Sequence, residues 1–383
     1  MTPERVEKAV APAVRPVRPG ASLPLLPRGV LGSADSKGLP ATLLRRAIIY
    51  LTNQSASDTI WLVRDAMTKP KTLQQAIIYF SDADNCLAYM VDLRWPNGVE
   101  CPTCGRKDPV FLANQRKWQC KSVHTKRQFS AKIGTIFEDS ALPLDKWLVA
   151  VWMIANCKNG VSSYEVARSL GVTQKSAWFM LHRIRLAMQN RSMLKLGGKG
   201  KTVEVDESFI GGAARNMHQD KRRRRITETG TKDKTPVMGI LERGGEVRAM
   251  MIPTRRKHHL QAEIRAHVKA GSAIYTDALM SYQGLQHQDF EHQVIDHAEK
   301  YVDGQVHTNG LENFWSLLKR GIKGTYVSVE PFHLFRYLDE QVFRYNLREL
   351  PHDGARFEHL ASHILGKRLT YAEVTGKVGQ TTN

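Results

Sequence analysis

The sequence predicts an α/β fold because two segments with the pattern of strands and a later one with the pattern of a helix each carry an acidic residue. KTVEVDESFIGG and SAIYTDALMSY have the pattern of strands and carry Asp206 and Asp277 toward their ends. HTNGLENFWSLLK, further along the chain, has the period of an amphipathic helix and carries Glu312. Two acidic strands followed by an acidic helix suggest an RNase H-like nuclease core, in which helices flank a mixed sheet.

The elements of this core are expected in a definite order within residues 200–350. Asp206 would lie on the first strand, and Gly211 and Gly212 would let the chain turn sharply after it. The elements expected next are strands near Val237 and Val247, a helix after Arg256, the strand that ends at Asp277, and later helices.

The predicted helix around Glu312 separates its side chains onto a polar and an apolar face. The polar face holds Asn309, Glu312, Asn313, Ser316 and Lys319, and the apolar face holds Leu311, Phe314, Leu318 and Ile322. Asn309 and Glu312 also have the spacing of a helix cap with a reciprocal glutamate, which is a purely structural alternative. The two acidic strands favour the interpretation as a site.

Carboxylates brought together in this way suit a divalent metal ion. Magnesium, or manganese in its place, prefers oxygen ligands and keeps several waters, so neither cysteine nor histidine is required. In a two-metal site one ion activates the attacking oxygen and the other stabilises the leaving oxygen of a phosphodiester. We predict Asp206 and Asp277 as the bridging and flanking ligands, although either alone could be an ordinary surface aspartate.

A second metal site is predicted within residues 96–138, the expected zinc ribbon. Cys101 and Cys104 form one knuckle, and Cys120 with His124 would supply the second pair of a tetrahedral Zn²⁺ site. A lone CxxC can instead be a redox motif. The later cysteine and histidine favour zinc, which would make the ribbon fold by binding metal.

Residues 142–192 carry apolar positions at helical spacing through three segments, the pattern of a helix-turn-helix domain. Ser162 and Glu165 resemble a capping box at the start of the second helix, and residues 171–173 form the turn into the third. The residues expected to contact DNA from the third helix are Thr173, Gln174, Lys175, Trp178 and Arg183. A three-helix bundle without a DNA role is the alternative, although His182 and Arg185 on the same helix favour DNA.

The charge of the chain favours a polyanionic partner. Lysine and arginine number 56 against 37 acids, which gives a formal net charge of +19. The densest run is Lys221, Arg222, Arg223, Arg224 and Arg225, directly after the strand that carries Asp206. This run is either a solvated loop or a phosphate clamp near the cut site.

The remaining segments, at the two ends of the chain, complete the predicted domain organisation. Residues 1–66 are rich in proline and small residues, so we expect disorder there, or an over-extended reading frame ahead of a natural start at Met67. Residues 67–95 are expected to form a helical segment and residues 351–383 a C-terminal tail. The chain has no run of about 18 apolar residues, so no membrane span is expected, and its few cysteines fit a reducing cytoplasm.

Five segments together resemble the signature blocks of zinc-ribbon DDE transposases of bacterial insertion sequences, the family numbered fifteen ninety-five. They are WPNGVECPTCG, VEVDESFIGG, YTDALMSY, HTNGLENFWSLLKRGIKGTY and RYLDEQVFRYN. The resemblance places the first two catalytic acids on Asp206 and Asp277 and the downstream lysine on Lys319. Subgroups of the family use glutamate or asparagine as the third metal-side residue, so Glu312 is the preferred candidate and Asn309 the alternative.

Further roles and two departures also follow from the resemblance. Many relatives carry a glutamate followed by arginines four and seven residues later; here Glu340 and Arg344 keep the first spacing, whereas Leu347 occupies the second arginine position. A surface ion pair is the alternative for Glu340 and Arg344. Relatives usually have a cysteine where this chain has His124.

The resemblance implies an enzyme that cuts transposon ends and joins the freed 3′-hydroxyl to target DNA. Lys319 would steady a phosphate, double-stranded DNA would be the partner, and a homo-oligomer acting at the nucleoid in the cytoplasm is expected. Two alternatives stay open: a catalytically decayed DNA-binding protein, and a nuclease without joining activity.

Overall fold

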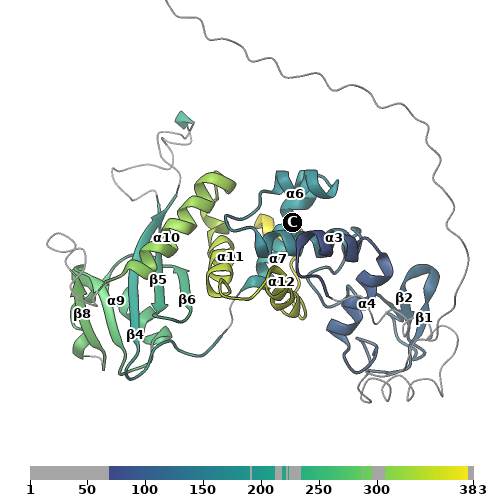
Figure 1. Ribbon diagram of the computed structural model, residues 1–383, viewed down its shortest axis with the longest axis horizontal. Helices are drawn as coiled ribbons and strands as arrows, with labels where there is room; N and C mark the ends of the chain where they lie inside the picture. The colour runs from purple at the N-terminus through teal and green to yellow at the C-terminus, as the bar shows by residue number, and fades with distance from the viewer. Residues whose placement is uncertain are drawn as a thin grey trace, which may run out of the picture. The chain divides into compact units, whose positions relative to one another are not determined.

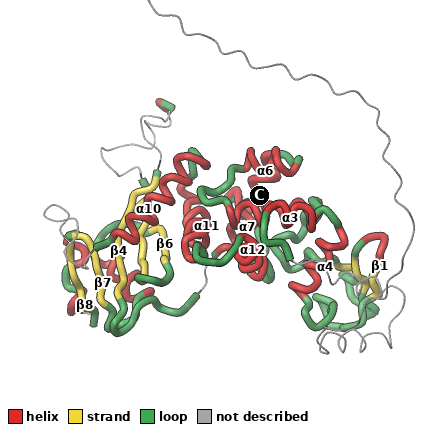
Figure 2. Tube along the Cα trace, in the orientation of Figure 1, coloured by secondary structure: helices red, strands yellow, loops and turns green. Residues whose placement is uncertain are grey.

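The computed structural model describes residues 69–189, 192–211, 218–220, 223, 234–287, 289–295 and 307–377. Figure 1 shows the ribbon, and Figure 2 shows the helices, strands and loops along the same trace. The predictions for residues 1–66, Gly212, Lys221, Arg222, Arg224 and Arg225 lie outside the described residues. Within these ranges, no helix combines the length and apolar character needed to cross a membrane.

Two helices and a small antiparallel sheet form the first part of the described chain. They are α3 (Leu73–Phe80), α4 (Ala83–Arg94), β1 (Val110–Leu112), β2 (Lys117–Gln119) and β3 (Gln128–Phe129), with the strands in the order β1-β2-β3. Trp118 and Phe129 stack across β2 and β3 with ring centroids 6.0 Å apart, and both are buried. A sheet this short has little core of its own, so another source of stability is expected.

Three helices follow at the predicted places. They are α5 (Leu144–Asn156), α6 (Ser163–Leu170) and α7 (Gln174–Met188). Ser162 caps α6 by accepting the Glu165 N–H at 3.1 Å, and Gly171 ends it in the left-handed region at φ 59°. The predicted start at Ser162 and the turn at Gly171 are therefore confirmed, whereas the return bond from the Glu165 side chain that would complete a capping box is not present.

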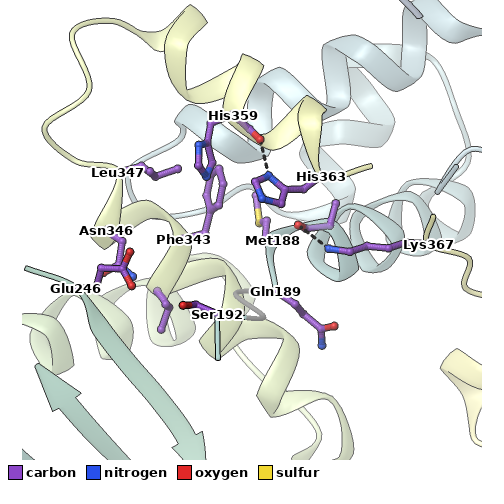
Figure 3. Close-up of a pocket in the computed structure, with 12 residues that line it drawn as sticks. Met188, Gln189, Ser192, Glu246, Phe343, Asn346, Leu347, His359, His363 and Lys367 are labelled. Carbon is purple, nitrogen blue, oxygen red and sulfur yellow. Dashed lines mark hydrogen bonds between the residues drawn. The ribbon is translucent and has the colours of Figure 1, made fainter. Parts of the chain in front are cut away.

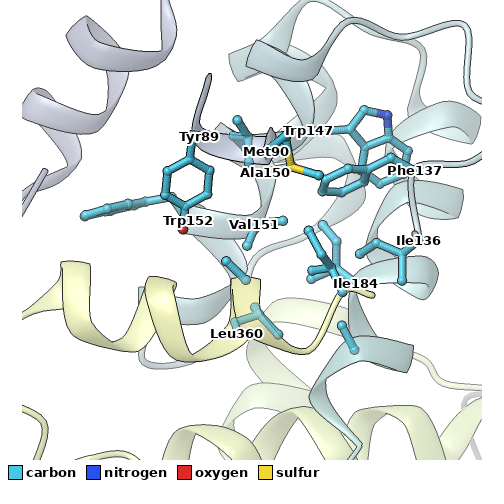
Figure 4. Close-up of a cluster of buried hydrophobic side chains, with 14 of the residues drawn as sticks. Tyr89, Met90, Ile136, Phe137, Trp147, Ala150, Val151, Trp152, Ile184 and Leu360 are labelled. Carbon is cyan, nitrogen blue, oxygen red and sulfur yellow. The ribbon is translucent and has the colours of Figure 1, made fainter. Parts of the chain in front are cut away.

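The C-terminal residues predicted as a tail return to the same helical core. α12 (Asp353–Ser362) and α13 (Tyr371–Thr375) both lie within residues 351–383. Figure 4 shows Leu360 of α12 in one apolar cluster with Trp147, Val151 and Trp152 of α5. Segments about 200 residues apart in sequence thus share one core, because each helix has an apolar face to bury.

A five-stranded mixed sheet occupies the region predicted as the core. Its strands are β4 (Thr202–Ile210), β5 (Thr235–Glu242), β6 (Val247–Met251), β7 (Ala273–Asp277) and β8 (Glu291–Ile295), in the order β6-β5-β4-β7-β8. β5 is antiparallel to both β4 and β6, whereas β7 is parallel to both β4 and β8. The sequence did not predict β8, and Asp206 lies in the middle of β4, not near its end.

Helices cover both faces of this sheet. They are α9 (Lys257–His267) on one face, and α10 (Asn309–Gly321) and α11 (Leu334–Asn346) on the other. Alternate residues of β4 follow this division, because Val205 packs in the α9 cluster and Ile210 in the α10 cluster. Asp206 therefore shares the face of α10. Figure 1 shows α10 lying across the strands.

Short helical turns complete the connections. They are η1 (Ala113–Gln115), η3 (Met280–Tyr282), η4 (Leu285–His287), η6 (Pro331–His333) and the π-helical turn η5 (Ile322–Tyr326), which continues α10.

Candidate active site

Helix α10 presents the polar face that the sequence predicts. The five predicted residues, Asn309, Glu312, Asn313, Ser316 and Lys319, are exposed, as is Arg320, whereas Leu311, Phe314 and Leu318 are buried. The N-cap of α10 is Thr308, whose own side chain makes no capping bond, and neither Asn309 nor Glu312 caps the helix. The alternative interpretation of Asn309 and Glu312 as a capping pair is therefore wrong.

A buried carboxylate on β4 positions the start of α10. Glu204 accepts the Leu311 N–H at 3.0 Å and the Arg243 Nε–H at 2.8 Å. The helix comes so close that a Cβ on Gly310 would lie 2.4 Å from Leu241 and 2.7 Å from Glu204. Glycine at position 310 is therefore required by the close approach of helix and sheet.

An indole holds the first predicted acid. Trp315 donates its Nε1–H to Asp206 Oδ2 at 3.0 Å. Gly239 pairs with Asp206 across β4 and β5, and a Cβ there would lie 2.7 Å from the Trp315 ring. Neither Trp315 nor Gly239 was predicted from sequence, since an aromatic on the apolar face of a helix ordinarily signals core packing.

Acidic side chains crowd the cavity beneath α10. A cavity of about 380 Å³ is lined by Asp206, Glu207, Ser208, Glu312, Trp315, Ser316 and Lys319. Burial and the nearby Asp277 raise the pKa of Asp206 to about 6, and Glu312 adds to the effect. Burial, Asp277 and Asp206 raise the pKa of Glu207 to about 8. Asp206, Glu312, Lys319 and the charge of Asp277 thus come together, while Asn309 does not line this cavity.

The crowding fits a divalent cation, because carboxylates that repel one another are stabilised by a positive charge between them. Glu207 also keeps a buried oxygen, Oε1, without a hydrogen-bond partner. Glu207 was missed from sequence, although it directly follows Asp206. In the described ranges, one group of His, Cys, Asp or Glu side chains is placed closely enough to share a metal ion, and it lies in the expected zinc ribbon.

That group consists of the four residues predicted for zinc. Cys101, Cys104, Cys120 and His124 bring their ligand atoms within 4.8 Å of one another. Cys101 Sγ lies 3.5 Å from His124 Nε2, and Cys104 Sγ lies 3.5 Å from Cys120 Sγ. All five cysteines are free. Three thiolates and one imidazole at this spacing suit tetrahedral Zn²⁺, with histidine in place of the usual cysteine.

We expect His124→Ala to lower the zinc content of the purified protein and to loosen the ribbon around Trp118. One of four ligands is lost, and zinc supplies much of the folding energy of so small a sheet. Zinc content by atomic absorption measures the first effect, and the change in tryptophan fluorescence during chelator titration, relative to a Trp118→Phe variant, measures the second. Val123→Ala is the matched control, because Val123 is 95% exposed beside the ligand. Equal zinc retention by the two variants would contradict the assignment.

Helix α7 uses several of its predicted DNA-contacting residues for folding. Thr173 is exposed and caps the helix by accepting the Ser176 N–H at 3.2 Å. Gln174 donates to Ser163 Oγ at 2.8 Å. Lys175 is exposed over the Tyr371 ring, and Trp178 packs against His182 and His333.

Arg183 differs from its prediction. Its side chain is 5% exposed and donates to the backbone carbonyls of Leu369, Ile136 and Glu138. His182 and Arg185 are buried as well. Arg183 and Arg185 bond inside the helical core and cannot argue for DNA binding, because a buried charge does not reach a phosphate. Burial lowers the pKa of His182 to about 2, so its ring is neutral. Among the residues of the predicted basic run, the structure describes Arg223, which is exposed.

Glu340 and Arg344 form neither a surface pair nor part of the carboxylate site. Glu340 is 0% exposed and accepts from Arg185 Nε at 2.6 Å. It also accepts from Arg344 Nη1 and from the Tyr326 hydroxyl. Arg185 belongs to α7, and Tyr326 to the turn η5 that continues α10. The buried Glu340 cluster therefore ties the helical region to the end of α10.

A second cavity, of about 460 Å³, lies apart from all the predicted site residues. Figure 3 shows His359 of α12 and His363, which follows the end of that helix, beside Phe343 and Asn346 of α11 in its wall. Lys367 there donates to the Ala187 carbonyl at 3.2 Å. None of the predicted acids lines this cavity.

Comparison with known proteins agrees with this arrangement. Residues 195–346 match the ISXO2-like transposase domain, and residues 81–125 match the transposase zinc-ribbon domain. An uncharacterized protein in transposable element ISH50 of Halobacterium salinarum is 28% identical over 243 residues, 60% of this chain and 80% of the relative. An uncharacterized transposase-like protein of Haemophilus influenzae is 30% identical over 105 residues, 27% of this chain and 85% of the relative. The chain belongs to the insertion-sequence transposases that combine a zinc ribbon with an ISXO2-like domain.

Proposed function

We propose that this transposase cuts DNA at the ends of its insertion sequence and joins the freed 3′-hydroxyl to target DNA, using divalent metal. The observation that carries the proposal is the crowding of Asp206, Glu312 and Lys319 in one cavity, with the charge of Asp277 acting on Asp206. Cleavage of a phosphodiester in DNA requires carboxylates that hold divalent metal and is helped by a cation that binds phosphate.

The sheet topology supports an RNase H-like core. Counted along the chain, the strand order is three, two, one, four, five, with the first three antiparallel and the last two parallel to the first. This is the arrangement of an RNase H-like fold. Asp206 on the central strand, Asp277 at the end of its parallel neighbour and Glu312 on the later helix occupy adjacent positions in it.

Each residue has a proposed role. Asp206 and Asp277 would hold the metal, with Glu312 as the third ligand; Glu312 is favoured over Asn309 because it lines the cavity. When bound, magnesium or manganese would polarise the phosphodiester and lower the pKa of the attacking water. Lys319, exposed at the same cavity, would hold a phosphate. Trp315 and Glu204 position Asp206 and the start of α10.

The other domains are proposed to hold the DNA. Residues 96–138 would form the ribbon with structural zinc, 142–192 a helix-turn-helix domain, and 200–350 the catalytic domain. Thr173 and Lys175, exposed at the start of α7, support a contact with the major groove. Two ends must be brought together, so we expect at least a dimer, acting on chromosomal DNA at the nucleoid in the cytoplasm.

We expect Asp277→Asn to abolish products in a magnesium-dependent cleavage and strand-transfer assay on duplex DNA carrying the element ends. Loss of one carboxylate removes a metal ligand without a change of size. Asn313→Ala is the matched control, since Asn313 is exposed on α10 but does not line the cavity. Wild-type cleavage without joining would indicate a nuclease, and end binding without any product would indicate a decayed DNA-binding protein; either result contradicts the proposal.

A further inference from the structure

A second basic cluster, absent from the sequence predictions, lies at the turn from β6 into α9. Arg255, Arg256, Lys257 and His258 are consecutive and all exposed; we call them the α9 basic turn. Within the described residues, none of their side chains pairs with a carboxylate. Exposed unpaired cations of this density are costly to bring together unless an anion binds them.

The turn is held beside the candidate active site by two anchors. The Arg255 guanidinium lies 4.7 Å from the centroid of the Phe209 ring. Ser281 Oγ donates to the Arg255 carbonyl oxygen at 2.7 Å. Phe209 follows Asp206 by three residues on β4, and Ser281 follows Asp277 by four residues. The segments that carry both aspartates therefore fix the place of Arg255.

Strand alternation places the turn on the α9 side of β4. Phe209, against which Arg255 packs, shares the face of Val205, and Glu207 lies between these two residues on the same face. Glu207 lines the cavity with Asp206 and Glu312. The basic turn thus lies on the α9 side of the site, whereas Lys319 lies on the α10 side.

Stability of the fold does not explain these cations. α9 has no acidic residue in its first turn, and its N-cap residue Arg256 makes no side-chain capping bond. Positive side chains at the start of a helix oppose its macrodipole. The placement is unfavourable for the isolated helix, so it indicates a binding role.

We propose that the α9 basic turn binds backbone phosphates of duplex DNA and holds the strand against the carboxylates, a role that rests on the proposed transposase function. Arg255, stacked on Phe209, keeps its N–H edges available for two parallel bonds to one phosphate. Arg256 and Lys257 supply further charge without reading bases. The duplex is either the transposon end or the target.

The test measures DNA affinity of the full chain without divalent metal, as a function of salt. Each phosphate contact contributes about 0.9 to the slope of log affinity against log salt, so Arg255→Ala/Arg256→Ala should lower the slope by about two. The control double variant is Lys199→Ala/Lys269→Ala, which removes two exposed cations near the other end of α9 and should leave the slope unchanged. Arg255→Lys should restore part of the loss, since charge remains but the planar fork does not.

Two probes distinguish the sources of the duplex. One probe carries the element end, and the other has a random sequence of equal length. If the Arg255→Ala/Arg256→Ala variant lowers the salt slope only with the first probe, the turn binds end DNA. If it lowers the slope with both probes, the turn binds any duplex, including target DNA. Equal slopes for the two double variants with both probes would overturn the proposal. The proposed transposase function is tested separately, because it would fail if the wild type gave no magnesium-dependent products. The salt slopes are measured without metal and do not depend on that result.

Discussion

Asp206→Asn is expected to abolish DNA cleavage and, in the absence of metal, to stabilise the protein at pH 7.5. Loss of this proposed metal ligand would cost several kcal/mol of transition-state stabilisation, on the order of a hundredfold to a thousandfold in rate. The gain in stability has a separate origin. Burial and Asp277 raise the pKa of Asp206 to about 6, so keeping this carboxylate ionised at pH 7.5 lowers the free energy of unfolding.

The direction of the pH dependence follows from the raised pKa. The folded state binds the proton of Asp206 more tightly than the unfolded state, whose pKa lies near 3.8. Its contribution to stability is therefore fully present below about pH 4 and is lost as the pH rises through 6. A shift of about two units corresponds to roughly 3 kcal/mol above that pH, which asparagine would recover.

Urea unfolding at pH 5 and pH 7.5, with and without magnesium, measures the effect. The stability difference between Asp206→Asn and the wild type should be larger at pH 7.5, and magnesium should stabilise the wild type alone. Asp108→Asn is the control of opposite sign, because Arg106 and Lys121 lower the pKa of Asp108. A variant that is less stable than the wild type at pH 7.5 without metal would show that the carboxylates do not repel one another.

Glu340→Ala is expected to destabilise the fold by about 3–5 kcal/mol, because it leaves Arg185 and Arg344 buried without a counter-charge. Burial alone would raise the pKa of Glu340, yet Arg344 and Arg185 lower it to about 2. Glu340 therefore stabilises the protein above about pH 4.5, and this contribution is lost as the pH falls toward 2. Urea unfolding at pH 7 followed by circular dichroism measures the loss.

The matched control is Glu349→Ala, which breaks an ion pair with Arg348 just beyond α11. Glu349 is 84% exposed, so its loss should change stability by about 0.5 kcal/mol or less. Cleavage should also fall in Glu340→Ala, because Tyr326, at the end of η5, loses its acceptor. Equal stability of the two variants would contradict the account of the buried Glu340 cluster.

The periodicity of the sequence is sufficient to predict α10 and its polar face. An amphipathic helix must turn its apolar side toward the sheet, so Leu311 and Phe314 had to be buried and Glu312 exposed. The strands with Asp206 and Asp277 were predictable for the same local reason. β8 was not, because its five residues, EHQVI, carry too weak an alternation to stand out.

Long-range contacts decided what local patterns could not. Trp315 had the spacing of a core residue, and only the approach of α10 to Gly239 turned its indole toward Asp206. Arg183 and Arg185 favoured a DNA-binding helix in the sequence, yet both are buried and bond to partners far along the chain.

The sequence by itself determined the family, the zinc ligands as a set and the order of acidic elements, since motifs and periods are local properties of the chain. Only the tertiary structure decided which charges face solvent and which acids crowd one cavity. Burial and the electrostatic coupling of Asp206, Glu207 and Asp277 depend on distances between segments up to 71 residues apart, and such distances exist only once the sheet has formed.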